Sequence, residues 1–356
     1  MNKLYYPVLK TKRTSFLAIK DLKEKTKTKI IPIFEIIPEE EIKPEKIISS
    51  LKSYIPKYMP VILDFAYLDN DENNDLNEFI FSVVNNCKSN GFNIIPMSGI
   101  GRSNEYDMAI SETSKKLNLE NVAVRIPLEI ATKNIVDNTI IEDNIADILI
   151  AFIKNIGLSH DKLMVFLDLE MVDNNLYYYA AEKVLSKISN LKYKTLGVLA
   201  GAFPSSEKFQ DLRGDSVEIK RFDYDIWKLL KKSSNSFANN LVYGDYTIRD
   251  VNLPYDGIVP HIVPILRYTK KEHYYVWRGI SSANHNRGMH QFNDACRLLS
   301  QQQFFRGKDF SAGDRMIFEK ASDLNSSAGN QATWAQIGIN QHIEFVVYQL
   351  ANSTYF

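Results

Sequence analysis

Cysteine is nearly absent from this chain of 356 residues, which contains only Cys87 and Cys296. The two lie far apart and form no CxxC pair, which argues against a disulfide framework and against a zinc ribbon. So few cysteines are typical of a protein that keeps its thiols reduced. We therefore expect a cytoplasmic location and no disulfide.

An excess of charge of either sign is also lacking, because 43 Lys and Arg residues balance 43 Asp and Glu residues. The sequence thus predicts no bulk attraction to nucleic acid or anionic lipid, although a local basic groove stays open. Residues 1–12 contain no apolar run of signal-peptide length. The longest apolar runs, such as Leu163–Leu169, are far shorter than the ~20 residues of a membrane span. We expect no membrane partner.

Linear catalytic signatures are missing too. The chain has no GxSxG elbow, no HExxH pair, no GxxxxGK[ST] loop and no GxGxxG after a predicted strand. The sequence therefore gives no support to an acyl-transfer hydrolase, a zinc protease, a P-loop NTPase or a dinucleotide-dependent dehydrogenase. Any active site has to be inferred from the fold.

What the sequence does contain is a repeated pattern of short apolar runs, each followed by an amphipathic segment of helical length. Nearly continuous apolar runs are typical of parallel strands that are covered on both faces. There are eight of them: Leu4–Leu9, Ile30–Ile36, Pro60–Phe65, Asn93–Ser98, Asn121–Pro127, Lys162–Leu169, Thr195–Ala200 and Leu241–Thr247.

The segments between these runs predict helices. Residues 77–90 and 142–155 place apolar side chains at helical spacing and stop before Gly91 and Gly157, which is the usual position of a C-terminal cap. Eight strand–helix units favour a closed barrel over an open doubly wound sheet, which usually has five or six strands. We predict an α/β fold with a (β/α)8 TIM-like barrel over residues 1–250.

The repeat ends after Asp250, and residues 251–356 predict an α+β C-terminal extension that packs on the barrel. Residues 258–268 and 273–278 resemble two strands around a polar turn. Three helix candidates follow, at 288–302, 312–323 and 333–351.

Charged residues cluster where the predicted barrel strands end. In such barrels the carboxyl ends of the strands form the functional mouth. A charge inside an apolar strand is costly unless it is paired or bound to something. Eight residues meet this description: Lys10, Glu35, Asp64, Arg125, Glu129, Asp168, Glu170 and Asp245.

These charges have two interpretations. In the first, Lys10 and Arg125 bind an anionic ligand while the carboxylates hold a divalent metal or move protons. In the second, the same groups neutralise one another and close the end of the barrel without a ligand. No linear motif distinguishes the two.

Two loops add a possible phosphate site. Gly201, Ser205 and Ser206 follow the seventh strand, and Gly244 lies in the eighth, where barrels often bind phosphate through backbone N–H groups. The segment 98–103 after the fourth strand is similar. Glycines in tight turns and serines at helix starts explain the same residues without a ligand.

The extension mixes cations with aromatic residues. Arg267, Trp277 and Arg278 lie in the two predicted strands, and Arg306 follows the Phe304–Phe305 pair. Such a mixture suits a partner-binding surface or a nucleic-acid strand. It also suits a sheet whose aromatic face packs on the barrel, and zero net charge favours packing over nucleic-acid binding.

With these motifs in view, the chain resembles the Beta protein family, which is named for the middle gene of the gop–beta–cll cassette of satellite phages. The most specific part is a Gly-Asn-Thr-Trp-Gly-Asn-His series near the C-terminus. The resemblance rests on Tyr6-Pro-Val-Leu-Lys10, Pro32-Ile-Phe-Glu35, Leu167-Asp168, Tyr243-Gly-Asp245, Phe310-Ser-x-Gly-Asp314 and Gly329-Asn330-x-x-Thr333-Trp334-x-x-x-Gly338-x-Asn340-x-His342.

The resemblance implies a part in bacterial anti-phage defence, encoded on a mobile element, beside a toxic effector that the Beta-type protein restrains. It implies no catalytic residues. Three hypotheses follow: a regulator that senses a ligand or a partner, a metal-assisted hydrolase or lyase acting on a phosphorylated or nucleotide substrate, and a nucleic-acid-binding module.

Overall fold

Eight parallel strands form a closed barrel in the computed structural model, which describes residues 3–38, 43–69, 75–131, 145–251 and 262–353. Each strand pairs with its neighbour in chain order, and the last pairs with the first: Tyr5 lies opposite Tyr243. The barrel strands are β1 (Tyr5–Lys10), β2 (Ile33–Glu35), β3 (Val61–Asp64), β4 (Ile94–Gly99), β5 (Val122–Pro127), β6 (Leu163–Met171), β7 (Thr195–Gly201) and β9 (Leu241–Asp245).

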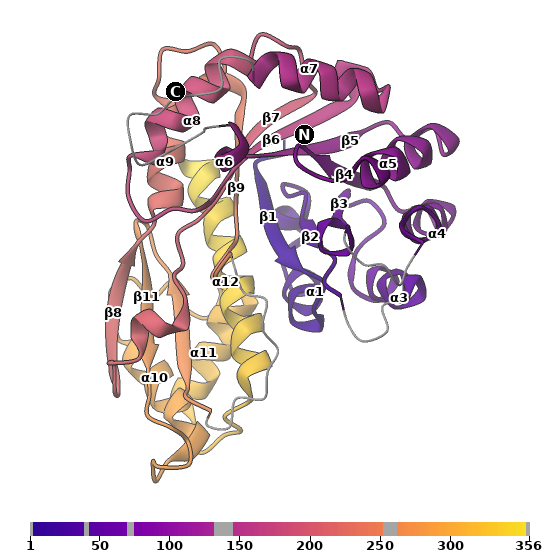
Figure 1. Cartoon of the computed structure of the whole chain (residues 1–356). Helices are drawn as coiled ribbons and strands as arrows, with labels where there is room; N and C mark the ends of the chain where they lie inside the picture. Colours follow the sequence, from indigo (N-terminus) through magenta and orange to yellow (C-terminus); the bar gives the residue numbers. More distant parts are fainter. Residues whose placement is uncertain (1–2, 39–42, 70–74, 132–144, 252–261, 354–356) are drawn as a thin grey trace.

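Helices surround this barrel (Figure 1). They form because apolar residues recur at helical spacing and bury one face against the strands. In α4, for example, the face with Phe79, Val83 and Cys87 is buried. The helices are α1 (Arg13–Lys20), α2 (Glu24–Lys27), α3 (Pro44–Tyr54), α4 (Leu76–Ser89), α5 (Asn104–Lys116), α6 (Leu128–Ala131), α7 (Ile145–Ile156), α8 (Tyr177–Ile188) and α9 (Phe222–Lys231). The predicted start of α7, at 142–144, lies outside the described residues.

A second, antiparallel sheet lies beside the barrel in the order β10–β11–β8. It contains β10 (Ile265–Thr269), β11 (His273–Arg278) and β8 (Asp215–Lys220). Residues 258–261 of the strand predicted at 258–268 lie outside the described residues, and the strand that is seen starts at Ile265. Together with α10 (Gln291–Ser300) and α11 (Ala312–Ser322), this sheet forms what we call the lateral unit, seen at the lower left of Figure 1.

The last helix, α12 (Gln331–Asn352), returns the chain to the barrel. It packs against α1 and β1 on one side and against β10 and α11 on the other. It therefore lies between the barrel and the lateral unit (Figure 1). The eighth barrel strand, β9, is thus followed by the strands and helices of the lateral unit. The helix that covers the barrel after β9 is α12, at the end of the chain.

Two contacts cross the expected division at residue 250. Strand β8 lies before that residue yet pairs along its length with β11, and α12 lies after it yet covers β1. Sequence spacing could not show this, because strand pairing and helix packing join residues that are far apart in the chain. The division of the chain into 1–250 and 251–356 stays a prediction.

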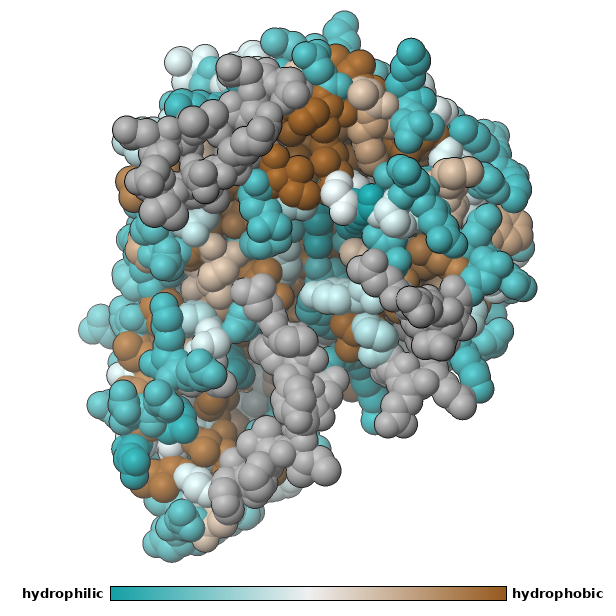
Figure 2. All heavy atoms as spheres, viewed as in Figure 1, coloured by the Kyte–Doolittle hydropathy of each residue, from teal (hydrophilic) through white to brown (hydrophobic). Residues whose placement is uncertain are grey.

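The hydrophobic core has three parts. One fills the barrel interior, including Val8, Ile62 and Phe166, and a larger one lies between the strands and the helices. A third, around Trp277 and Trp334, belongs to the lateral unit and the start of α12. On the face shown in Figure 2, hydrophilic residues are spread over the barrel and over the lateral unit. The outline of the molecule is hollowed between the two.

Candidate functional site

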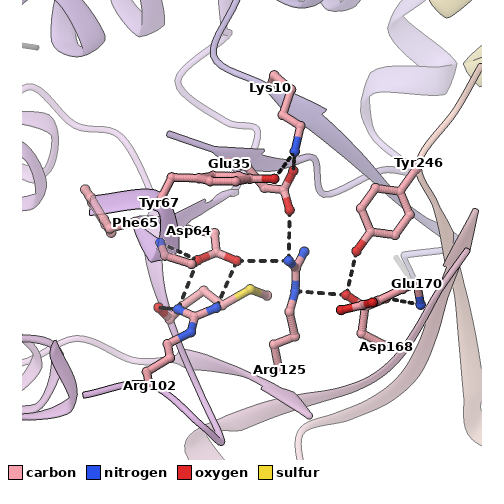
Figure 3. Close-up of polar contacts among 12 residues, drawn as sticks. Lys10, Glu35, Asp64, Phe65, Tyr67, Arg102, Arg125, Asp168, Glu170 and Tyr246 are labelled. Carbon is pink, nitrogen blue, oxygen red and sulfur yellow. Dashed lines mark hydrogen bonds and ion pairs between the residues drawn. The ribbon is translucent and has the colours of Figure 1, made fainter. Parts of the chain in front are cut away.

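The carboxyl ends of five barrel strands bring charged side chains together (Figure 3). Lys10 ends β1, Glu35 ends β2, Asp64 ends β3, Arg125 lies in β5 and Asp168 lies in β6. Strand side chains alternate between the two faces of a sheet, and these five share the inner face. The structure thus brings together five of the eight charges that the sequence predicted at the mouth.

Arg125 stands at the centre of this mouth cluster. Its Nη1 lies 2.8 Å from Oε1 of Glu35 and 3.3 Å from Oδ2 of Asp64. Its Nε lies 3.4 Å from Oδ2 of Asp168. One guanidinium therefore faces carboxylates from three different strands, which is the arrangement that makes a buried charge tolerable.

Arg102, which the sequence did not assign to the mouth charges, completes the cation set. It follows β4, and its Nη1 lies 2.9 Å from one oxygen of Asp64 while its Nη2 lies 3.0 Å from the other. It also donates to the carbonyl of Met97 and the hydroxyl of Tyr106. The only signal in the sequence was its place in the glycine-containing loop after the fourth strand.

Lys10 connects the cluster to an open cavity. Its ammonium lies 2.5 Å from Glu35 and donates to the hydroxyl of Tyr67 over 2.6 Å. The cavity has a volume of about 130 Å³. Residues around it include Lys10, Lys12, Glu35, Tyr67, Tyr246 and Arg249.

The pKa values of the buried carboxyls differ because their partners differ. Burial alone would raise the pKa of Asp64, but Arg102 and Arg125 hold it below its usual value. Burial raises the pKa of Asp168, and the longer contact with Arg125 and the 2.5 Å bond from Tyr246 offset this only in part. Asp64 is therefore a fixed charge, whereas Asp168 takes up a proton more readily.

Glu129 and Glu170 lie at the rim of the mouth and are exposed. Glu170 has a φ of 53°, which is a strained value for a residue with a side chain. Burial and then the neighbouring charges of Asp168 and Glu129 raise its pKa. Both residues thus stay near the predicted site, outside the ion-pair network.

Asp245 does not lie at the mouth, which corrects the expected gathering of all eight charges. It is fully buried outside the barrel wall, where it accepts hydrogen bonds from Tyr5, from Tyr243 at 2.8 Å and from His342 at 3.0 Å. The reason is strand alternation: Asp245 shares the outer face of β9 with Tyr243, and the next residue, Tyr246, points to the mouth.

Among the described residues, no three His, Cys, Asp or Glu side chains are arranged so that they could hold a metal ion. The buried carboxylates of the mouth cluster already accept from Lys10, Arg102 or Arg125. The donor set that is present therefore fits an ion-pair network with a cavity beside it better than a divalent cation site.

The sequence model of the family described as Beta protein matches residues 5–348, nearly the whole chain. The chain belongs to the Beta protein family. No curated protein matches the sequence. Among solved structures, a mutant tryptophan synthase alpha-subunit from the hyperthermophile Pyrococcus furiosus is 11% identical, with a TM-score of 0.40 over 68% of this chain and 86% of that chain.

Two of the glycines proposed for phosphate binding have packing roles in this Beta family protein. A Cβ on Gly244 would meet Leu199 and would lie 2.6 Å from the carbonyl oxygen of Tyr6. A Cβ on Gly201 would meet Val251. Ser205 precedes a short 3-10 helix at Ser206–Phe209 and makes no side-chain cap. Phosphate binding by these four residues stays a prediction.

The four residues expected to bind a partner have different surroundings. Trp277 is buried in the core of the lateral unit. Arg267 lies over the ring of Phe203, and Arg278 donates to the carbonyl of Leu212 over 2.7 Å. Arg306 is exposed. Of the four, Arg306 is thus the best placed to contact a partner. None of the described helices has the length and apolar character of a membrane-crossing segment.

Proposed function

We propose that this Beta family protein is a regulatory component of an anti-phage defence system. The barrel mouth binds a small anionic ligand, and the lateral unit contacts a partner protein, a toxic effector that the complex restrains. Family membership supports the defence role. The single observation that supports ligand sensing is the unfilled hydrogen-bonding capacity of Arg125.

The guanidinium of Arg125 is buried, and its Nη2 has no hydrogen-bond partner among the residues that the structure describes. In Figure 3 its end points between Glu35 and Tyr246, both of which line the cavity. A buried donor without an acceptor costs about 1–3 kcal/mol, more when it is charged. An anion that entered beside Lys10 would supply the missing acceptor.

The positive charges near the mouth cavity strengthen the case for an anion. Burial, and then the positive charge of Arg249, lower the pKa of Arg267 to about 10. Arg249 itself lines the mouth cavity. Among the described residues no carboxylate lies within ion-pair distance of Arg267. Three cations, Lys10, Lys12 and Arg249, line the cavity together with two carboxylates, Glu35 and Asp250. This excess of positive charge favours a ligand with negative charge.

The test compares Lys10→Gln with Lys116→Gln, a variant of an exposed lysine that pairs with Glu112 away from the mouth. The probe is inorganic phosphate, followed by the rise in melting temperature. We expect phosphate to stabilise the wild type and the Lys116→Gln protein, with a clearly smaller rise for Lys10→Gln. Equal rises in all three proteins would remove the mouth as the anion site.

The biological part of the proposal has its own readout. In cells that carry the neighbouring genes of the cassette, Lys10→Gln should change phage plating efficiency while Lys116→Gln should not. Co-purification of the effector should survive Lys10→Gln and weaken in Arg306→Ala. Unchanged plating with a folded Lys10→Gln protein contradicts the sensing role.

A second candidate function, general acid–base catalysis on the bound anion, is favoured by Glu170. Its strained backbone and raised pKa at a mouth rim are features of catalytic carboxyls. Catalysis would make Glu170→Gln lose protection as fully as Lys10→Gln. A regulator would tolerate Glu170→Gln, because the residue makes no ion pair with Lys10 or Arg125 in the described network.

A further inference from the structure

A second cavity, of about 280 Å³, lies at the opposite end of the barrel from Lys10. Lys29 lines it and precedes Ile30, which pairs with Tyr5 at the start of β1, whereas Lys10 is the last residue of that strand. The end of α12 and the segment 306–310 complete its walls. Its lining includes Lys23, Lys25, Lys29, Arg306, Phe310, Glu344 and Tyr348.

The charge of this second cavity is strongly positive. Four cations line it, and among the described residues none of them lies within ion-pair distance of a carboxylate. The one carboxylate in the lining, Glu344, accepts from the backbone N–H of Lys23 at 2.6 Å and from the hydroxyl of Thr26 at 2.7 Å. Glu344 therefore accepts hydrogen bonds from neutral donors, and the charges of Lys23 and Lys25 offset part of the rise in pKa that burial gives it. The ammonium of Lys23 also donates to the carbonyl of Asp309 over 2.8 Å. Lys25, Lys29 and Arg306 keep their capacity for an external anion.

Arg306 gives the cavity a flat, cationic wall. Its guanidinium lies 4.3 Å from the ring centre of Tyr348 and 4.8 Å from that of Phe310. Tyr348 is 43% exposed although it is a large aromatic residue. Rings hold this guanidinium by its face, which leaves the N–H groups at its edge free to bind phosphate oxygens.

The arrangement of the cations and aromatic rings around the second cavity favours one class of anion over others. The cations converge on one cavity and do not follow a line, which suits a compact dianion better than an extended polyanion. Stacked aromatic and guanidinium planes suit a planar base. The volume lies close to the lower end of the ~300–1,000 Å³ that is typical of small-molecule sites. A small phosphorylated molecule with a planar ring fits the compact arrangement of the cations, the stacked planes and the volume of the cavity.

We propose that this cavity binds a nucleotide, with the phosphate between the lysines and Arg306 and the base beside Tyr348. The phosphate neutralises charges that the protein leaves without a carboxylate partner. The source of the nucleotide is either a free mononucleotide or the phosphorylated end of a nucleic-acid strand. This inference does not depend on the ligand at the barrel mouth.

The test measures binding of adenosine 5′-monophosphate by calorimetry, next to adenosine, inorganic phosphate and a 5′-phosphorylated hexathymidylate. All titrations are done in Lys10→Gln protein, so that the mouth does not contribute. We expect adenosine monophosphate to bind at least about tenfold more tightly than adenosine, because the phosphate meets the cations. We expect Arg306→Ala to weaken that binding by about tenfold or more, since stacking and charge are lost together.

The matched control is Lys308→Gln, which removes a nearby exposed cation that lies over Phe318 and not in the cavity. It should change the affinity less than about twofold. Tighter, Arg306-dependent binding of the oligonucleotide supports the proposal and identifies nucleic acid as the source. Equal affinities for adenosine and its monophosphate, or an Arg306→Ala protein that binds like its Lys10→Gln parent, would each overturn it. Hexaglutamate is titrated as a further anion, and Arg306-dependent binding of hexaglutamate in place of the nucleotides would also overturn the proposal.

Discussion

Asp245 is the last residue of β9 and Tyr246 directly follows it, yet their side chains lie on opposite sides of the barrel wall. Tyr246 donates to Asp168 in the mouth cluster over 2.5 Å, and Asp245 accepts from His342 of α12 over 3.0 Å. The next residue, Thr247, has a φ of 59°, so the chain leaves the strand through a strained turn. Tyr246 and Asp245 therefore connect the mouth cluster to α12, the helix that contacts the lateral unit.

The first prediction concerns this connection. In a double-mutant cycle, Tyr246→Phe and His342→Gln should be non-additive by about 0.5 kcal/mol or more, because the two sites share the end of β9. Urea unfolding of both single variants and the double variant measures the coupling. The control pair is Tyr246→Phe with Asp314→Asn. Asp314 lies in the lateral unit, so the effects of these two substitutions on the free energy of unfolding should be additive. Equal behaviour of the two pairs would contradict the connection.

Replacing Arg125 should destabilise the protein strongly. Arg125→Met leaves Glu35, Asp64 and Asp168 without their shared counter-ion, and removal of one partner from a buried ion pair costs about 3–5 kcal/mol. The free energy of unfolding in urea measures the loss. Arg278→Met is the comparison, because Arg278 is partly exposed and bonds mainly to backbone carbonyls. Similar losses in both variants would show that the mouth network contributes little.

Asp245 should contribute to acid denaturation. Burial alone would raise its pKa, but His342 and Arg221 lower it from 3.8 to about 2. A carboxyl with a depressed pKa in the folded state contributes stability that is present above its unfolded pKa and is lost as the pH falls through the folded pKa. Unfolding free energies of wild type between pH 5 and pH 2 should therefore fall more steeply than those of Asp245→Asn. Parallel curves would argue against the depressed pKa.

Asp314 should have the opposite effect on the pH dependence of stability, because its pKa is raised and not lowered. Burial, offset in part by Ser311 and Tyr268, raises its pKa from 3.8 to about 6. The folded state then holds this proton more tightly than the unfolded chain, so stability falls as the pH rises from about 4 to about 6 and is level above that. Asp314→Asn should remove this pH dependence of the melting temperature. It should keep the bond from Tyr268, because an amide oxygen also accepts.

A methyl group at Gly244 should not fit. The added Cβ would lie 2.6 Å from a backbone oxygen that cannot move without disturbing β1, and overpacking of this kind costs about 1–3 kcal/mol. Gly214 provides the control: nothing lies within 4 Å of its Cβ position, and only its φ of 73° penalises alanine. Gly214→Ala should lower the melting temperature less than Gly244→Ala does. The reverse order would contradict close packing at β9.

The candidate site was predictable in part. Lys10, Glu35, Asp64 and Arg125 follow from apolar strands that end in a charge, since parallel strands of a barrel end at one mouth. Asp168 follows in the same way. Asp245 was misplaced because it carries the same signal, although alternation along β9 puts it on the outer face. Arg102 was missed because it lies in a loop, where no periodicity assigns a direction. Tyr246 lies within the strand predicted at 241–247 and was missed because the prediction considered charged residues only.

The sequence by itself determined the eight-stranded barrel, because each barrel strand is a short apolar run and amphipathic segments of helical length lie between these runs. Only the tertiary structure decided that β8 joins β11, that α12 returns to cover β1, and that Arg125 serves three carboxylates. Those relationships depend on contacts between residues that are distant in the chain, and such contacts leave no periodic trace in a single sequence.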